Sequence, residues 1–179
     1  AAAGNVLAQK TKITSGTFAE LKGQKEVNVV FDYSDLECVG GAPFSKKKKP
    51  EAEWIAEMKN KKNEKEAGAG DDWEKAWKAD RDGRFHGKFE ALFNKGMSKA
   101  GTKISRDYAD AKYTLVVHTT MTEPGFSVPM VMTVPASINL KIQLVETGSD
   151  KVLGEATALG APGNAFAGAA WDTGNRIQE

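Results

Sequence analysis

Apolar and polar residues alternate in several parts of the chain, and this period of two predicts strands. Between Glu26 and Tyr33 the apolar face of one predicted strand holds Val27, Val29, Phe31 and Tyr33. A weaker strand pattern surrounds Ile13. The glycines at 16 and 23 then frame a loop or a helical turn around Phe18 and Leu21.

The last third of the chain predicts three sequential strands. The first runs from Lys112 to Glu123 and turns at Pro124-Gly125. An unusually long alternation then runs from Val128 to Leu144, so a bend is expected near Pro135. After a turn at Gly148–Asp150, a third strand follows from Lys151 to Gly160. Its inward face holds only glycine and alanine, which predicts that a helix packs closely on it, and the three strands form an antiparallel meander.

Between these regions, the segment from Lys46 to Glu90 has the helical period. More than half of its residues are charged, with both signs interleaved, which favours solvent-facing helices. Trp54, Ile55 and Met58 give a first helix its apolar stripe; Gly68–Gly70 ends it, and Asp71 or Asp72 caps the next. The second helix carries an aromatic stripe that we assign to the core: Trp73, Trp77, Phe85, Phe89, Leu92 and Phe93. Gly83 and Gly87 fall on its solvent-exposed face, and a kink is expected at Asp82-Gly83.

This order of elements predicts a two-layer α+β fold: a strand, two helices, a three-strand meander and a terminal helix that starts at Asp172 or Thr173. The sheet is expected to be mostly antiparallel, with the helices on one face. Residues 12–179 are predicted to form this single domain. Residues 1–11 are either a signal-peptide remnant or a flexible terminus, because Val6 and Ala8 fit the small-residue positions of a signal-peptidase site. The first alternative predicts a periplasmic or secreted protein, and a cytoplasmic one stays open.

Charge and composition exclude several classes of function. The formal net charge is +1, which argues against a strongly basic nucleic-acid-binding protein. No apolar run reaches the length of about eighteen residues that a transmembrane helix needs. The four lysines at 46–49 form the one charge run; acidic residues follow at once, so a solvated loop is expected rather than a phosphate or lipid contact.

Signatures of catalysis are missing from the sequence. Cys38 is the single cysteine, and a nucleophilic role would need a base from His86 or His118. We expect His86 to be solvent-exposed on the charged helix and His118 to be an ordinary strand residue. Asp80, Asp82 and Gly83 suggest an EF-hand loop, but lysine and phenylalanine occupy its outer ligand positions. We therefore predict no catalytic residue, no metal ligand and no cofactor.

The layout resembles uncharacterised bacterial envelope proteins of α+β build. Four segments carry this resemblance: Val27–Asp32, Tyr113–Val117, Glu123–Gly125 and Asp172–Ile177. The order of elements is also similar to the amino-terminal domain of the Tol-system propeller protein, which implies a protein-interaction module. No functional residue transfers from either resemblance.

The sequence hypothesis is therefore a non-enzymatic envelope module that binds a protein partner or a small ligand, with no nucleic acid and no transmembrane segment. We predict its contact surface at Phe126, Met130 and Met132, in an apolar hairpin region. The alternative is a hydrolase that uses two facing carboxylates on an envelope carbohydrate.

Overall fold

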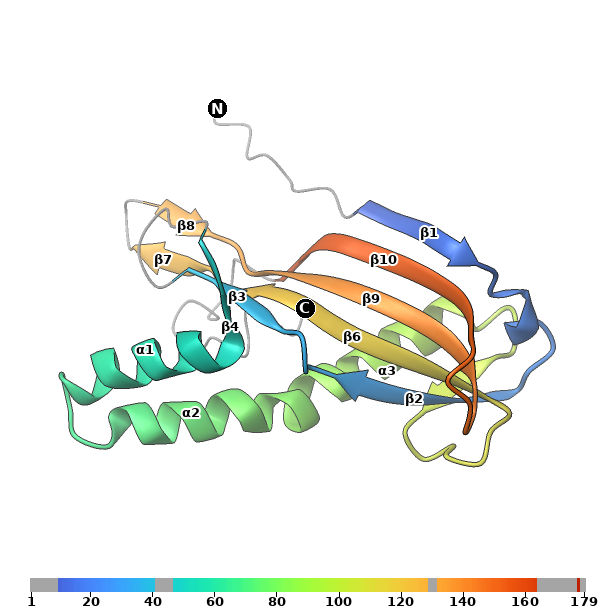
Figure 1. Ribbon diagram of the computed structural model, residues 1–179, viewed down its shortest axis with the longest axis horizontal. Coiled ribbons are helices and arrows are strands. Elements are labelled where there is room, and N and C mark those ends of the chain that lie inside the picture. Colours follow the sequence, from blue (N-terminus) through green and yellow to red (C-terminus); the bar gives the residue numbers. More distant parts are fainter. Residues whose placement is uncertain (1–9, 41–46, 129–131, 164–176, 178–179) are drawn as a thin grey trace.

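The computed structural model describes residues 10–40, 47–128, 132–163 and 177 (Figure 1). Its strands are β1 (Lys10–Gly16), β2 (Glu26–Asp32), β3 (Glu37–Val39), β4 (Lys48–Pro50), β5 (Lys103–Ser105), β6 (Tyr113–Glu123), β7 (Phe126–Val128), β8 (Met132–Val134), β9 (Ser137–Glu146) and β10 (Val152–Pro162). Its α-helices are α1 (Glu51–Asn63), α2 (Ala69–Asp80) and α3 (His86–Gly96). A short 3₁₀ helix at Ala19–Leu21 follows β1, where the sequence predicts a helical turn or a loop.

The sheet is open and mixed, and it confirms the α+β fold class. Its strand order is β1-β10-β9-β6-β2-β5, with β3 paired to β6 and β4 paired to β3. The meander of β6, β9 and β10 is antiparallel, as predicted. β2 instead runs parallel to both β5 and β6, because the helices cross over between them. The long alternation does break at Pro135-Ala136, between β8 and β9.

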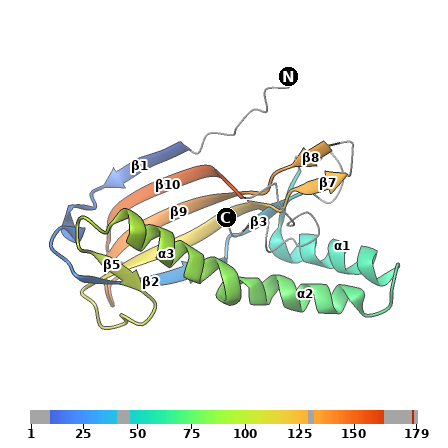
Figure 2. The same ribbon diagram turned by 180° about the vertical axis from the view of Figure 1, so that it is seen from behind.

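The helices lie to one side of the sheet. Seen from behind, α3 crosses one sheet face, while α1 and α2 extend beyond the end of the sheet (Figure 2). Between α2 and α3 the helix continues through a π-helical turn at Arg81–Phe85, where the sequence predicts a kink. Gly83 and Gly87 are exposed on its outer side, as expected.

The start of α2 differs from the prediction. Asp71 and Asp72 lie in the first turn, and the N-cap is Gly68, with a φ of 86° that glycine adopts easily. The free amide of Gly70 donates instead to Asn63 Oδ1 of the preceding helix at 2.7 Å. A side chain from α1 therefore satisfies the first turn of α2, and the two helices form a close hairpin.

The buried residues form two clusters. One lies between the sheet and α3 and includes Val27, Val29, Ile104, Leu115 and Leu144. The other lies where α1 and α2 meet β3, and it includes Cys38, Trp54, Trp77 and Ile177. The predicted stripe at Trp54 and Ile55 is buried as expected, since both side chains are less than a tenth exposed.

Two predictions of local structure are wrong. The small residues of β10 do not admit a helix: a Cβ at Gly154 would overlap the Thr17 carbonyl oxygen, so the backbone after β1 makes the close approach. The lysine run is not wholly a loop either, because Lys48 and Lys49 belong to β4 and pair with Val39 and Cys38.

Some predictions fall outside the described residues. These are the terminal segment up to residue 9, Met130, and the terminal helix apart from Ile177, which is helical and buried. Within the part of the chain that the structure describes, no helix has both the length and the apolar character needed to cross a membrane.

Candidate functional site

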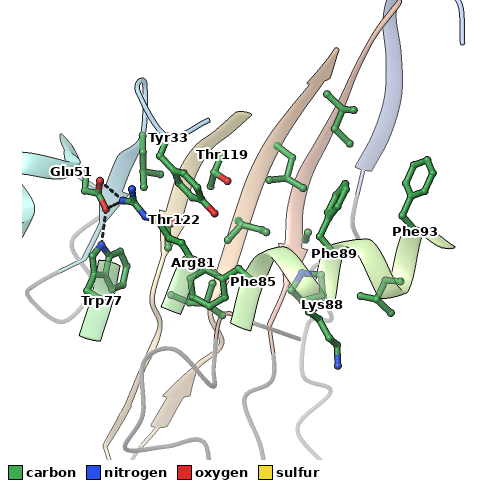
Figure 3. A pocket seen from close by; sticks show the side chains of 18 residues that line it. Tyr33, Glu51, Trp77, Arg81, Phe85, Lys88, Phe89, Phe93, Thr119 and Thr122 are labelled. Atoms are coloured by element: carbon green, nitrogen blue, oxygen red, sulfur yellow. Dashed lines mark hydrogen bonds and ion pairs between the residues drawn. The ribbon is translucent and has the colours of Figure 1, made fainter. Parts of the chain in front are cut away.

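A cavity of about 500 Å³ lies between the helical segment and the inner face of the sheet. Figure 3 shows that side chains of α2, the π-helical turn and α3 form one wall and those of the strands the other. The helical wall consists of Trp77, Arg81, Phe85, Lys88, Phe89, Leu92 and Phe93. The opposite side consists of Tyr33, Leu36, Glu51, Thr119, Thr122, Ile138, Leu140, Ile142, Ala161, Pro162 and Ile177.

Most of this cavity is apolar because two periodic patterns face each other across it. Ile138, Leu140 and Ile142 are alternate residues of β9 and therefore share its inner face. Phe85, Phe89 and Phe93 recur every four residues on the helix opposite. The aromatic stripe that we assigned to the core is thus only partly buried, and Leu92 is 52% exposed. The stripe is a cavity wall as well as part of the core.

One end of the cavity carries an ion pair. Arg81 Nη2 donates to Glu51 Oε1 and Oε2 at 2.5 and 2.6 Å, and Trp77 Nε1 donates to Glu51 Oε1 at 2.6 Å. The Arg81 guanidinium also lies over the Tyr33 ring, 4.1 Å from its centroid. Glu51 therefore ties α1 to the end of α2, and its charge is compensated within the cavity lining.

A chain of hydrogen bonds leads from the cavity to the surface. Tyr33 Oη lies 3.1 Å from His86 Nε2, and His86 Nδ1 lies 2.9 Å from Asp82 Oδ1. Arg106 donates to the same Asp82 oxygen at 3.1 Å. Arg106 Nη1 also lies 3.3 Å from His86 Nδ1, but the Asp82 oxygen is nearer and can only accept. We therefore assign the His86 proton to Nδ1, and Nε2 then accepts from the Tyr33 hydroxyl.

The prediction that His86 is solvent-exposed is wrong. Its side chain is 10% exposed and stacks on Phe31, with the ring centroids 4.0 Å apart. Burial lowers the pKa of His86, and Asp82 opposes that effect only in part. Burial likewise raises the pKa of Tyr33 to about 12. Both groups are therefore neutral at pH 7, as the hydrogen-bond assignment requires.

Acidification is expected to destabilise the protein through His86. The folded state binds a proton at His86 less readily than the unfolded chain does, so this contribution to stability is present above about pH 6.5 and is lost as the pH falls below it. Asp82, Glu90 and Arg106 are the charged groups that act on this imidazole. Thermal unfolding measured from about pH 8 to about pH 5 tests this. His86→Gln should flatten this part of the profile, and an unchanged slope would contradict the assignment.

Cys38 and His118 do not form a nucleophilic pair. Cys38 is fully buried, and burial raises the pKa of its thiol to about 12, so no thiolate forms at neutral pH. His118 lies in a row of hydrogen bonds across the sheet, with Nδ1 2.6 Å from Asp32 Oδ2 and Nε2 3.0 Å from Gln143 Oε1. It is an ordinary strand histidine with both nitrogens bonded, as expected.

The lysine run contacts acidic residues of its own chain. Lys48 pairs with Glu37 at 3.5 Å, and Lys49 pairs with Glu53 and Glu57. Lys47 also has an interaction partner, and Lys46 lies outside the described residues. Each described lysine of this run therefore has an interaction partner within the chain.

Two residues of the predicted contact surface, Phe126 and Met132, belong to short strands outside the main sheet. Phe126 begins β7 and Met132 begins β8, and the two strands pair as a separate hairpin. The role of Phe126, Met130 and Met132 as a contact surface stays a prediction.

The sequence raised two catalytic arrangements that can be compared with the described residues: a metal site and a pair of facing carboxylates. No group of three or more His, Cys, Asp or Glu side chains among residues 10–40, 47–128, 132–163 and 177 could hold a metal ion. Glu51 is the one carboxylate in the described lining of the cavity, and it is paired with Arg81. The facing carboxylates that a glycosidase needs are therefore not found in this lining.

Sequence reasoning missed the residues at the polar end of the cavity. The one available signal was the pattern that put Tyr33 on the same face as Val27 and Val29; Tyr33 lies just beyond the end of β2 and does line the cavity. Glu51 and Arg81 are 30 positions apart in a segment full of charges, so nothing in the sequence distinguishes their pairing from the others.

Comparison with known proteins gives only distant likenesses. No family model matches the chain, and no curated protein matches it. The PelC dodecamer from Paraburkholderia phytofirmans is 12% identical, with a TM-score of 0.34 over 96% of this chain and 99% of that chain. A point variant of that dodecamer is 14% identical, with a TM-score of 0.35 over 94% and 92% of the two chains. TM-scores of this size do not establish a shared fold.

Proposed function

We propose that this chain is a non-enzymatic binding module of the bacterial cell envelope and that its cavity takes an apolar small ligand. The observation that carries the proposal is the cavity itself. Its volume of about 500 Å³ lies within the range of about 300–1,000 Å³ that is typical of small-molecule sites. Its walls are mainly aliphatic and aromatic, with a few polar groups gathered at one end, which is the usual composition of such a site.

Burial of an apolar ligand between these walls supplies the driving force for binding. Phe85, Phe89 and Phe93 offer ring faces and edges, and the β9 residues opposite are aliphatic. Each square ångström of apolar surface removed from water contributes about 25 cal/mol. The hydrolase alternative has no comparable support, because the one carboxylate in the described lining is held by Arg81 and Trp77.

The test is a titration with N-phenylnaphthylamine, an uncharged apolar fluorophore that brightens when it leaves water. We expect saturable binding to the wild-type chain. Ala161→Phe adds a ring to a small residue of the cavity lining on β10 and should weaken binding at least about tenfold, the cost of roughly 1.4 kcal/mol of lost contact.

Thr157→Phe is the matched control. Thr157 precedes buried Ala158 on the same strand, so its side chain points to the opposite sheet face. The same added ring there should leave binding unchanged. Both variants must keep the wild-type unfolding transition. Linear, unsaturable fluorescence, or equal binding by a folded Ala161→Phe variant, would overturn the proposal.

A further inference from the structure

We propose that the ligand is an uncharged amphiphile with a hydroxyl end, and that Tyr33 is the residue that recognises this hydroxyl. This inference rests on the proposed function and narrows it to a ligand class. Three observations carry it: the compensated charges of the lining, the direction of the Tyr33 hydrogen bond, and the position of Tyr33 between the ion pair and the apolar walls (Figure 3).

The charges of the lining leave no buried partner for an ionised ligand. Arg81 contacts both oxygens of Glu51, so the two formal charges cancel locally. Lys88 is the remaining charged residue among the described lining residues, and it is exposed, with its side chain directed away from the sheet in Figure 3. A carboxylate headgroup would lose its water shell at the polar end without gaining a free cation, which is a large cost. The lining therefore favours a neutral headgroup.

The hydrogen bonds from Tyr33 through His86 to Asp82 determine whether the Tyr33 hydroxyl donates or accepts. Asp82 holds the His86 proton on Nδ1, so Nε2 accepts the Tyr33 hydroxyl proton. The phenol oxygen then has only lone pairs left. The Thr119 side chain lies beside Tyr33 in the cavity (Figure 3).

Tyr33 consequently offers an acceptor, and not a donor, to a ligand. A ligand that carries its own O–H donor satisfies this acceptor, whereas an ether or a ketone of the same shape brings no donor to the Tyr33 oxygen. A site whose buried polar group needs a donor discriminates strongly against an analogue that lacks one. Recognition by Tyr33 thus separates an alcohol from its ether, a distinction that apolar packing alone does not make.

The experiment compares decanol, decyl methyl ether and decanoate as competitors of N-phenylnaphthylamine on the full chain. The wild-type protein should bind decanol about tenfold more tightly than either of the other two, the value of roughly one good hydrogen bond. Tyr33→Phe should bring decanol and the ether to within about twofold of each other, with binding of the ether unchanged. Leu159→Ala, at a residue that is 46% exposed and not among the described lining residues, should keep the preference for the alcohol.

The outcomes separate the two proposals. If none of the three compounds displaces the fluorophore and the fluorophore itself does not saturate, the proposed function fails. If all three bind equally, or decanoate binds best and loses affinity in Lys88→Gln, the cavity is a binding site but the hydroxyl inference is overturned. The wild-type comparison needs no variant, so it decides the inference even where Tyr33→Phe does not fold.

Discussion

Leu144→Ala is expected to lower the free energy of unfolding by about 3 kcal/mol, within the range of about 2–5 kcal/mol for leucine truncation in a packed core. Leu144 has no exposed surface and lies near the end of β9. Its cross-strand neighbours are Leu115 on β6 and Gly154 on β10. Glycine has no side chain with which to fill the space, so the cavity left by the truncation should persist, and persistence of the cavity makes the cost large.

Urea denaturation of the wild type and the variant measures this difference. Leu159→Ala is the control, because Leu159 is 46% exposed on the neighbouring strand β10 and should change stability by less than about 0.5 kcal/mol. Equal losses in the two variants would show that Leu144 does not occupy the centre of the core.

Glu51→Gln is expected to cost about 2 kcal/mol, between the values for exposed and for fully buried ion pairs. The amide keeps the shape of the carboxylate but replaces one acceptor with a donor that faces Arg81 or Trp77. The side chains of Glu51 and Arg81 are 15% and 22% exposed, so water can compensate only partly for the lost partner. The variant should also weaken ligand binding, because it leaves the Arg81 charge uncompensated in the lining.

The control for Glu51→Gln lies two residues further along the same helix. Glu53 pairs with Lys49 at 3.5 Å, but its side chain is 57% exposed, so Glu53→Gln should change stability by less than about 0.5 kcal/mol. Chemical denaturation of both variants at neutral pH gives the comparison. A Glu51→Gln variant as stable as Glu53→Gln would contradict the role given to the Arg81–Glu51–Trp77 cluster.

The local patterns of the sequence predicted the elements well, and the long-range pairings poorly. The alternation around Val27 and the meander that includes Leu144 identified strands because a half-buried strand imposes a period of two on its residues. The parallel pairing of β2 with β6 has no such local signal, since it depends on a crossover between Asp32 and Tyr113. The sheet is consequently more mixed than the sequence indicated.

The candidate site shows the same division. Its apolar walls were visible as the stripe of Phe85 and Phe89 and as the inner face of β9. Its polar end was not, because His86 appears among charged residues and gives no sign that it stacks on Phe31. A single sequence does not distinguish a buried neutral histidine from an exposed one. Three-dimensional proximity alone distinguishes them.

The π-helical turn at Arg81–Phe85 sets how α2 and α3 are rotated relative to each other about the helix axis. The number of residues in this helical segment therefore affects which side chains face the cavity. In an uninterrupted α-helix, Trp77 and Phe89 would be twelve steps of about 100° apart and so would point about 120° away from each other. The wide turn accommodates one additional residue and reduces that angle to about 20°, so both side chains line one cavity. Loss of a single residue there would rotate one half of the wall away from the sheet. We expect evolution to tolerate substitutions in this segment more readily than insertions or deletions.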